Sequence, residues 1–251
     1  MTTIGSSNKE ENGIGIIDWD RRIYRFYRKK HFTDLVQKGK NCLVSPSKWG
    51  DPFENFFLTS KYIDRNGEAI SLEPLRKDWF GQCWTTHKNS GRMWCHYSPE
   101  SEAVRVSTTI RKLFDGFYDT SDQYAALKYF VGTVTYMREE NIRAYFKNTS
   151  IEDIVVGANS LGMAATLYIK EERYSWESEV RLLFYDVEGT ATGRDGHAFF
   201  DFNYTDVFDE IALDSRLAPH EFEEMRSELR ASGCTLPIIQ SGPYNVAQAQ
   251  L

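Results

Sequence analysis

Two glutamates, Glu177 and Glu179, have the clearest potential for chemistry in this chain. They lie in residues 174–185 (YSWESEVRLLFY), where polar and apolar residues alternate at the period of a β-strand. The segment is therefore predicted to be a buried strand, with Glu177, Glu179 and Arg181 on one face. Two carboxylates about 7 Å apart on a strand disfavour each other's ionised form. They need a cation, a ligand or a solvent-filled cleft, and Arg181 is a candidate cation.

Two other polar features stand on predicted strands far away in the sequence. Arg25 lies in residues 23–27 (IYRFY), and Thr85 and Thr86 end residues 80–86 (FGQCWTT). An arginine can grip phosphates bidentately, and a hydroxyl can orient a ribose. A carboxylate such as Glu179 can stabilise an oxocarbenium-like centre, as paired carboxylates do in glycoside hydrolysis. Together these groups suit a ligand such as NAD, which combines a diphosphate, riboses and nicotinamide as a leaving group.

Each of these features also has an ordinary structural interpretation. An arginine on a strand is usually a surface or ion-pair residue, and threonine has a high β propensity. Glu177 and Glu179 can form an ion pair with Arg181 at the mouth of a strand. The residues alone leave the structural and catalytic interpretations both open.

Residues 87–97 hold a second group of polar and aromatic side chains. His96 follows Cys95, but adjacent residues of an extended chain rarely face each other, so a Cys–His nucleophile is disfavoured. His87 and His96 lack the spacing of a metal pair. The aromatic residues here are predicted to form either a packed corner or a binding pocket. A turn-forming loop with Asp51 and Glu54 is a further candidate near a site.

Composition bounds the class of protein. The chain has 251 residues, 41% hydrophobic and 14% aromatic, with a net charge of −6, and a mean hydropathy of −0.51. These values predict a soluble globular protein that does not coat nucleic-acid phosphates generally. The four scattered cysteines are expected to be reduced. The polar N-terminus lacks the order of a signal peptide, so a cytoplasmic location is expected.

The order of elements predicts an α+β fold. Residues 1–17 are expected to be a flexible arm, and residues 18–251 a single domain. Helices are predicted at 31–38, 151–170 and 218–231, where apolar residues recur at helical spacing. Strands are predicted at 23–27, 41–45, 80–86, 103–108, 129–137, 199–202, 207–213 and 236–240. No GxGxxG, GxxxxGK[ST] or HExxH motif occurs.

A set of short motifs, spread over residues 23–245, resembles a bacterial family known as domain of unknown function twenty-nine seventy-one. Gly50 stands where that family usually has Asn, and Thr85 where it usually has Ser. The motifs are Tyr24-Arg25, Leu43-Val44-Ser45-Pro46, Asp51-Pro52-Phe53-Glu54, Cys83-Trp84-Thr85, Met93-Trp94-Cys95-His96-Tyr97, and Trp176 with Glu177-Ser178-Glu179-Val180-Arg181.

The order of arginine, hydroxyl-bearing strand and Glu-x-Glu is similar, more distantly, to the Arg–Ser–Glu arrangement of ADP-ribosyltransferases. This resemblance implies two small splayed sheets around an NAD cleft, with Glu179 catalytic and Glu177 acting on the acceptor. It also implies a toxin or phage-defence setting, with an antitoxin or regulatory partner. The residues expected to bind NAD are Arg25, Thr85, Thr86, Tyr24, Trp94, His96 and Tyr97.

Three functions follow as hypotheses. The first is an ADP-ribosyltransferase-like enzyme that transfers ADP-ribose from NAD to a protein or nucleic-acid acceptor, or to water. The second is a non-catalytic module that binds a nucleic acid or peptide through Trp84, Trp94, Tyr97 and Arg92. The third is a metal-dependent hydrolase or nuclease that uses Asp51, Glu54, Glu177 and Glu179.

Overall fold

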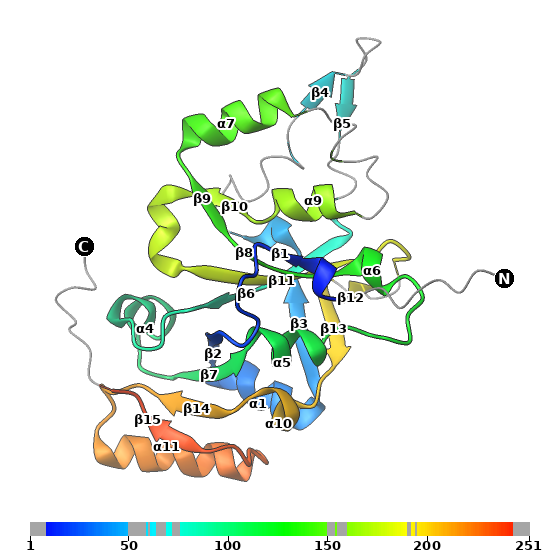
Figure 1. Cartoon of the computed structure of the whole chain (residues 1–251). Coiled ribbons are helices and arrows are strands. Elements are labelled where there is room, and N and C mark those ends of the chain that lie inside the picture. Colours follow the sequence, from blue (N-terminus) through cyan, green and yellow to red (C-terminus); the bar gives the residue numbers. More distant parts are fainter. Residues whose placement is uncertain are drawn as a thin grey trace. The chain divides into compact units, whose positions relative to one another are not determined.

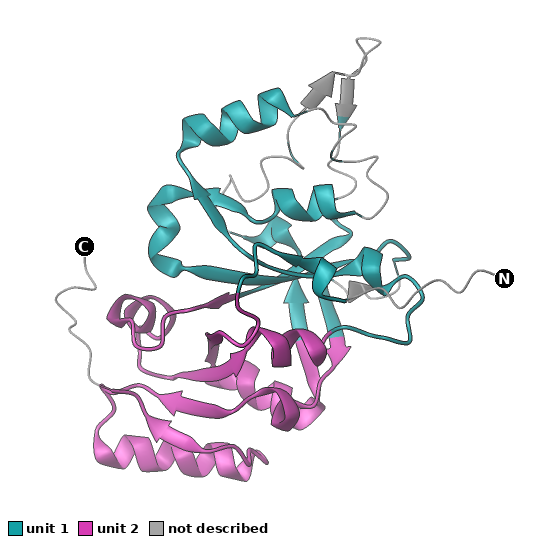
Figure 2. Ribbon diagram, viewed as in Figure 1, with its two compact units in different colours: residues 1–17, 42–83, 118–199 teal, residues 18–41, 84–117, 200–251 magenta. Residues whose placement is uncertain are grey.

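The computed structural model describes residues 9–49, 59, 61–63, 69–71, 76–149, 154, 160–189, 192–193 and 195–242. Figure 1 shows the elements in chain order. The chain divides into two compact units (Figure 2). Unit 1 is drawn from residues 1–17, 42–83 and 118–199, and unit 2 from residues 18–41, 84–117 and 200–251.

The main strands of unit 1 follow the order β1-β8-β11-β6. Strand β1 (Gly13–Ile14) pairs in parallel with β8 (Tyr129–Thr133), and β8 pairs antiparallel with β11 (Glu179–Tyr185). Next comes β6 (Trp79–Thr85), which pairs antiparallel with β3 (Lys40–Val44). Strand β13 (His197–Asp201) pairs with β3 and with β12 (Thr192–Gly193). Nearly every residue of β11 is buried, as expected for a strand covered on both faces.

Two short strand pairs stand apart from these strands. Strands β9 (Thr135–Met137) and β10 (Ile169–Glu171) are parallel, and β4 (Lys61–Ile63) and β5 (Ala69–Ser71) are antiparallel. The core of unit 1 joins β6, β8 and β11 to α7 (Glu139–Asn148) and α9 (Leu161–Thr166). Unit 1 also contains, among its described residues, the helices η1 (Lys9–Asn12), η2 (Pro46–Lys48), α6 (Ala125–Lys128) and η4 (Glu172–Glu177).

Unit 2 is built on β2 (Arg22–Arg28) and β7 (Ala103–Thr109), which pair antiparallel along their whole length. Strand β14 (Glu210–Leu213) pairs antiparallel with β7, and β15 (Ile238–Gln240) pairs in parallel with β14. At the end of β6, Thr85 pairs with Tyr24 of β2.

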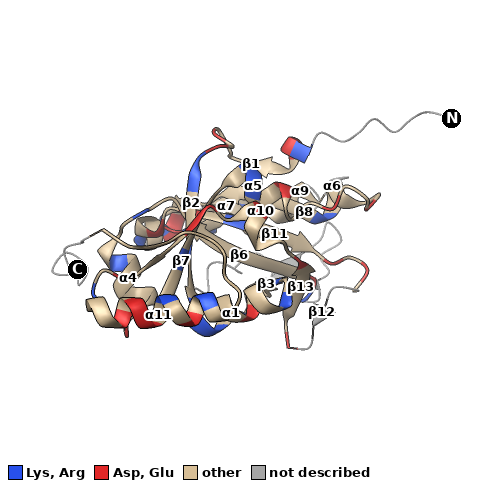
Figure 3. Cartoon of the chain, turned by 90° about the horizontal axis from the view of Figure 1, so that it is seen from below, with Lys and Arg blue, Asp and Glu red and all other residues tan. Residues whose placement is uncertain are grey.

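Three helix ends of unit 2 coincide with capping residues of the sequence, Gly39, Ser90 and Thr109. Helix α1 (Lys29–Lys38) ends at Gly39, whose φ of 59° is a left-handed conformation that glycine adopts without strain. The side chains of Ser90 and Thr109 cap α4 (Gly91–Tyr97) and α5 (Ile110–Asp115). Helices α10 (Tyr204–Val207) and α11 (Pro219–Ala231) complete the unit. Helix α11 carries both acidic and basic residues (Figure 3), while Met225 and Leu229 are buried.

The predicted α+β class is confirmed, and so are most predicted strands and the helix at 218–231. Most of residues 151–159, the first half of the helix predicted over 151–170, lie outside the described residues. The end of that prediction is wrong: α9 stops at Thr166, and Ile169 and Lys170 pair with β9 instead. Here strand pairing overrides the local helical periodicity. The strand predicted over 129–137 divides into β8 and β9 at Val134.

Part of the segment predicted as a flexible arm is structured. Residues 9–14 form η1 and β1, and the buried side chain of Asn12 donates to the carbonyl oxygens of Ala126 and Tyr129. The single-domain division, and the splayed arrangement of two sheets, stay predictions. In the part of the chain that the structure describes, no helix is long and apolar enough to cross a membrane.

Candidate functional site

The strand that carries the glutamates begins later than predicted. Residues 172–177 form the 3₁₀ helix η4, and β11 starts at Glu179. Between them Ser178 is left-handed, with φ 45° and ψ 58°, and its backbone N–H donates to Ser175. The predicted strand over residues 174–178 is therefore wrong, because this tight turn replaces extended backbone. Glu177 ends a helix, and only Glu179 stands on the strand.

Glu179 and Arg181 lie on the same face of β11, as the alternation predicts. Arg181 donates to Oε2 of Glu179 from Nε at 3.1 Å and from Nη2 at 2.6 Å. Glu179 is 7% exposed and Arg181 is 0% exposed. The predicted ion pair is thus present, and it is buried rather than placed at an open strand mouth.

Lys170 is a member of this site that sequence reasoning missed. Its Nζ lies 2.5 Å from Oε2 of Glu177 and 3.5 Å from Oε2 of Glu179. Its ammonium also lies 4.8 Å from the centre of the Tyr174 ring. A lysine predicted at the end of a helix gives no signal of a buried partner. The strand pairing of β10 with β9 is what places this lysine among the glutamates.

The electrostatics of the site keep Glu179 ionised. Burial alone raises the pKa of Glu179. The charges of Arg181 and Lys170, together with a hydrogen bond from Cys83, lower it by more than burial raises it, so the pKa falls below the ordinary value. The backbone N–H of Glu179 donates to the hydroxyl of Tyr136 at 2.9 Å. The site therefore holds a charged carboxylate in a low-dielectric interior.

Arg181 is also fixed from other directions. Its Nη1 donates to the carbonyl oxygen of Leu167 at 2.6 Å, and its guanidinium lies 4.6 Å from the centre of the Trp49 ring. The hydroxyl of Tyr168 donates to the Arg181 carbonyl oxygen at 3.4 Å. These contacts hold the arginine firmly, so it presents a fixed positive charge to Glu179.

In unit 2 the structure separates Arg25 from Thr85. Because Tyr24 and Thr85 are directly paired, their side chains share a face of the strands, and Arg25 points to the opposite face. The guanidinium of Arg25 lies 5.0 Å from the Tyr27 ring. This register does not favour a joint site for Arg25 and Thr85, which stays a prediction. Thr86, just past the strand, is half-buried.

Thr85 and Tyr24 already have structural roles. Both are buried, and the hydroxyl of Thr85 accepts from the backbone N–H of His87 at 3.1 Å. The ring of Tyr24 lies 5.1 Å from the guanidinium carbon of Arg105. A buried hydroxyl that closes a turn is poorly placed to orient a ribose.

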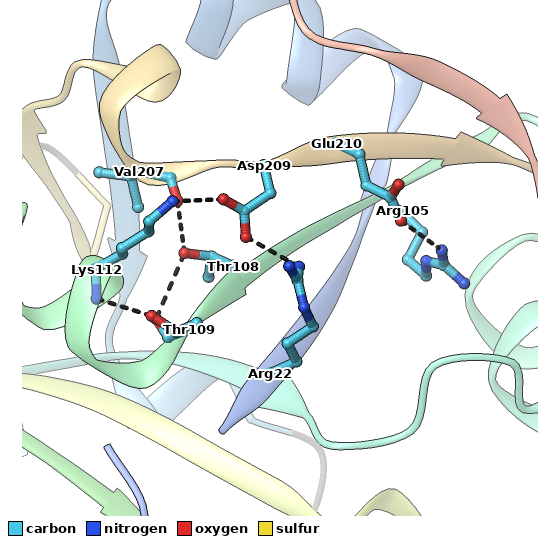
Figure 4. Close-up of polar contacts among 8 residues, drawn as sticks. All are labelled: Arg22, Arg105, Thr108, Thr109, Lys112, Val207, Asp209 and Glu210. Atoms are coloured by element: carbon cyan, nitrogen blue, oxygen red, sulfur yellow. Dashed lines mark hydrogen bonds and ion pairs between the residues drawn. The ribbon is translucent and has the colours of Figure 1, made fainter. Parts of the chain in front are cut away.

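Arg105 of β7 is a second residue that the sequence did not single out. It is fully buried, and its Nη1 donates to the Lys88 carbonyl oxygen and, at 2.7 Å, to Oδ1 of Asn89. Its Nη2 lies 3.9 Å from Glu210 (Figure 4). Burial lowers the pKa of Arg105, and the charges of Glu210 and Tyr24 offset only part of that effect. Arg105 thus ties the segment after β6 to the sheet of unit 2.

The aromatic residues of α4 divide into packed and exposed ones. Trp94 is 0% exposed and contacts Phe26 edge-on, with ring centres 4.7 Å apart. Tyr97 is 41% exposed and stacks on Phe26, with ring centres 6.0 Å apart, and His96 is exposed beside it. Because Trp84 and Trp94 are both buried, the predicted stacking pocket formed by these two rings and Tyr97 is wrong.

The metal hypothesis gains no support from the described residues, among which no group of three or more His, Cys, Asp or Glu could hold a metal ion. Lys170 and Arg181 occupy the places beside Glu177 and Glu179 where a cation would bind. Asp51 and Glu54, with the rest of their loop, lie outside the described residues.

No protein-family model matches this chain, so the resemblance to the domain of unknown function twenty-nine seventy-one family is not supported. No curated protein matches it in sequence. Among solved structures, three chains of Thermus sp. 2.9 DarT are similar. The chain titled in complex with NAD+ is 12% identical, covers 90% of this chain and 97% of its own length, and has a TM-score of 0.40. The chain in complex with ADP-ribosylated ssDNA is 11% identical, covers 89% of this chain and 94% of its own length, and has a TM-score of 0.39. The chain in complex with carba-NAD+ is 12% identical, covers 90% of this chain and 97% of its own length, and has a TM-score of 0.38.

Proposed function

We propose that this protein is an ADP-ribosyltransferase-like enzyme that uses NAD as its substrate and Glu179 as its catalytic carboxylate. The observation that carries the proposal is the state of Glu179. It is buried, yet Arg181 and Lys170 hold its pKa below the ordinary value, so it is charged at neutral pH. A second glutamate, Glu177, lies beside this carboxylate, because Lys170 contacts both glutamates while Arg181 contacts Glu179.

A charged carboxylate in this setting suits the cleavage of a glycosidic bond. As the bond between nicotinamide and ribose breaks, its electron pair leaves with nicotinamide, and positive charge develops on the ribose carbon. A fixed negative charge in a medium of low dielectric stabilises that centre more than it would in water. The ribose carbon then forms a bond to the acceptor nucleophile, which loses its proton. Glu177, beside Glu179, is the group proposed to take that proton.

The other predicted residues enter this proposal unequally. Arg25, Thr86, His96 and Tyr97 of unit 2 stay proposed contacts for NAD, since their side chains are at least partly exposed. Thr85 accepts from the His87 backbone, Trp94 packs on Phe26 and the Tyr24 ring lies beside Arg105, so we propose supporting roles for these three residues. The acceptor, a toxin or phage-defence role, and an antitoxin partner stay predictions.

The experiment that tests the proposal is incubation of the purified chain with NAD and a panel of acceptors. The panel contains protein, RNA, and single- and double-stranded DNA, with water as the default acceptor. We expect release of free nicotinamide, together with ADP-ribose either free or covalently attached to one acceptor by mass spectrometry. If every mixture leaves NAD intact, and NAD gives no thermal shift, the proposal is wrong.

A further inference from the structure

Four buried charged side chains of unit 1 form a continuous row, in the order Glu177, Lys170, Glu179, Arg181. Lys170 contacts Glu177 at 2.5 Å and Glu179 at 3.5 Å, and Arg181 contacts Glu179 at 2.6 Å. All four side chains are at most 7% exposed. The row contains two negative and two positive groups, so its charges balance.

The two cations of the row have different positions in it. Arg181 lies at one end and is fixed by Leu167 and by Trp49 as well as by Glu179. Lys170 lies in the middle, between the carboxylates, and is supported by the Tyr174 ring. Removing Arg181 would leave Lys170 between the glutamates, whereas removing Lys170 would leave the glutamates facing each other.

We propose that Lys170 is a positioning residue that couples Glu177 to Glu179, holding both carboxylates turned toward its ammonium group. The inference rests on the proposed function, because it assigns how the two glutamates of that site are held for their separate roles. The left-handed turn at Ser178 supports it. That turn removes Glu177 from the strand, and the Lys170 contact is what brings its carboxylate back beside Glu179.

The groups that face Glu179 come from several elements of unit 1. The turn and strand supply Glu177 and Arg181, and β10 supplies Lys170. Cys83 of β6 donates to the carboxylate, and Tyr136 of β9 accepts from the Glu179 backbone. The thiol and the phenol are neutral at the pH values where carboxylates titrate. A change in the titration of Glu179 therefore reports on Lys170, Glu177 or Arg181.

The test is a carboxyl titration by NMR on the whole chain with ¹³C-labelled glutamate. The variants are K170M, K170R, E177Q and the double variant K170M/E177Q, and the Glu179 signal is assigned by its loss in E179Q. An adjacent opposite charge typically lowers a carboxyl pKa by about one to three units. We expect K170M to raise the pKa of Glu179 by about one unit or more, and K170R to leave it nearly unchanged. In K170M/E177Q, the pKa of Glu179 should lie closer to its wild-type value than it does in K170M.

A matched control is K128M. Lys128 is another buried lysine of unit 1 with two carboxylate partners, Asp122 and Glu188. Its replacement should leave the Glu179 titration where it is. If K170M fails to fold while K170M/E177Q folds, the coupling is supported, since the uncompensated Glu177 is the difference between them. The inference is overturned if K170M leaves the pKa of Glu179 at its wild-type value. It is also overturned if the pKa of Glu179 is the same in K170M and in K170M/E177Q.

Activity provides the second readout and separates this inference from the proposed function. In K170M, the acidic limb of the pH profile of nicotinamide release should move to higher pH, and K170R should restore it. If K170M shifts the titration but the wild type never consumes NAD, the proposed function fails and the coupling stands. If the wild type consumes NAD but K170M moves neither titration nor pH profile, the coupling fails and the function stands.

Discussion

The guanidinium of Arg181 donates two hydrogen bonds, at 3.1 Å and 2.6 Å, to the same carboxylate oxygen of Glu179. Both side chains are buried. The pair therefore joins two residues at the start of β11, and the charge of Arg181 lowers the pKa of the Glu179 carboxyl. A buried pair of this kind is costly to break on one side, because the remaining charge has no compensation.

Replacing Arg181 by leucine should lower the free energy of unfolding by about 3–5 kcal/mol, because Glu179 would keep only Lys170 as a cation. Urea unfolding measures the change. The matched control is Arg173→Leu, because Arg173 also pairs with a glutamate, Glu171, but its side chain is 57% exposed. The control should lose less than about 1 kcal/mol. Equal losses in the two variants would show that the buried pair contributes nothing special.

Stability should depend on pH through Glu179. The folded pKa of this carboxyl is lower than its ordinary value of 4.5. Its contribution is therefore complete above that ordinary value and is lost as the pH falls through the folded pKa. The difference in unfolding free energy between wild type and Glu179→Gln, measured in urea from pH 7 to pH 2, should shrink below about pH 4.5. A difference that stays constant into acid would contradict the assignment.

Thr85 and Thr86 should separate stability from ligand binding. Thr85→Val removes a buried hydroxyl that accepts from the His87 backbone, and it should cost about 1 kcal/mol in urea unfolding. Thr86→Val removes a half-buried hydroxyl and should cost less than about 0.5 kcal/mol. In turn, Thr86→Val should raise the KM for NAD more than Thr85→Val does. A larger increase of the KM for NAD in Thr85→Val than in Thr86→Val would indicate that Thr85, not Thr86, contacts NAD.

Arg105 should control the order of the segment after β6. Arg105→Met removes its bonds to Lys88 and Asn89, so backbone amides of residues 86–90 should exchange with deuterium faster. The control is Arg226→Met, because Arg226 forms an exposed pair with Glu223 in α11. Hydrogen exchange read by mass spectrometry compares the two variants. Unchanged exchange at 86–90 in Arg105→Met would mean that other contacts hold this segment.

The sequence predicted what depends on local pattern. Alternation placed Glu179 and Arg181 on one face of a strand, and that face carries their ion pair. Gly39 marked the end of α1, and the spacing in residues 218–231 identified α11, which the structure places at Pro219–Ala231. These features are set by residues close in the chain, so periodicity and capping reveal them.

The errors arose where distant contacts decide the structure. Lys170 joins the glutamates because β10 pairs with β9, a contact that local helical spacing hides. Glu177 leaves the strand because Ser178 adopts a left-handed conformation, which serine rarely signals. The face of Arg25 relative to Thr85 depends on the register of β2 against β6, and one residue of register reverses it.

The most direct test of the central claim is the rate of nicotinamide release from NAD by Glu179→Gln. Its matched control is Glu172→Gln, because Glu172 lies in the same segment but is exposed and pairs with Arg138 at the surface. With folding of both variants checked by circular dichroism, we expect a loss of about 100-fold or more in Glu179→Gln, as when one charge-stabilising group is removed from a reaction centre. Glu172→Gln should retain the wild-type rate. A folded Glu179→Gln protein that releases nicotinamide at the wild-type rate would contradict the account.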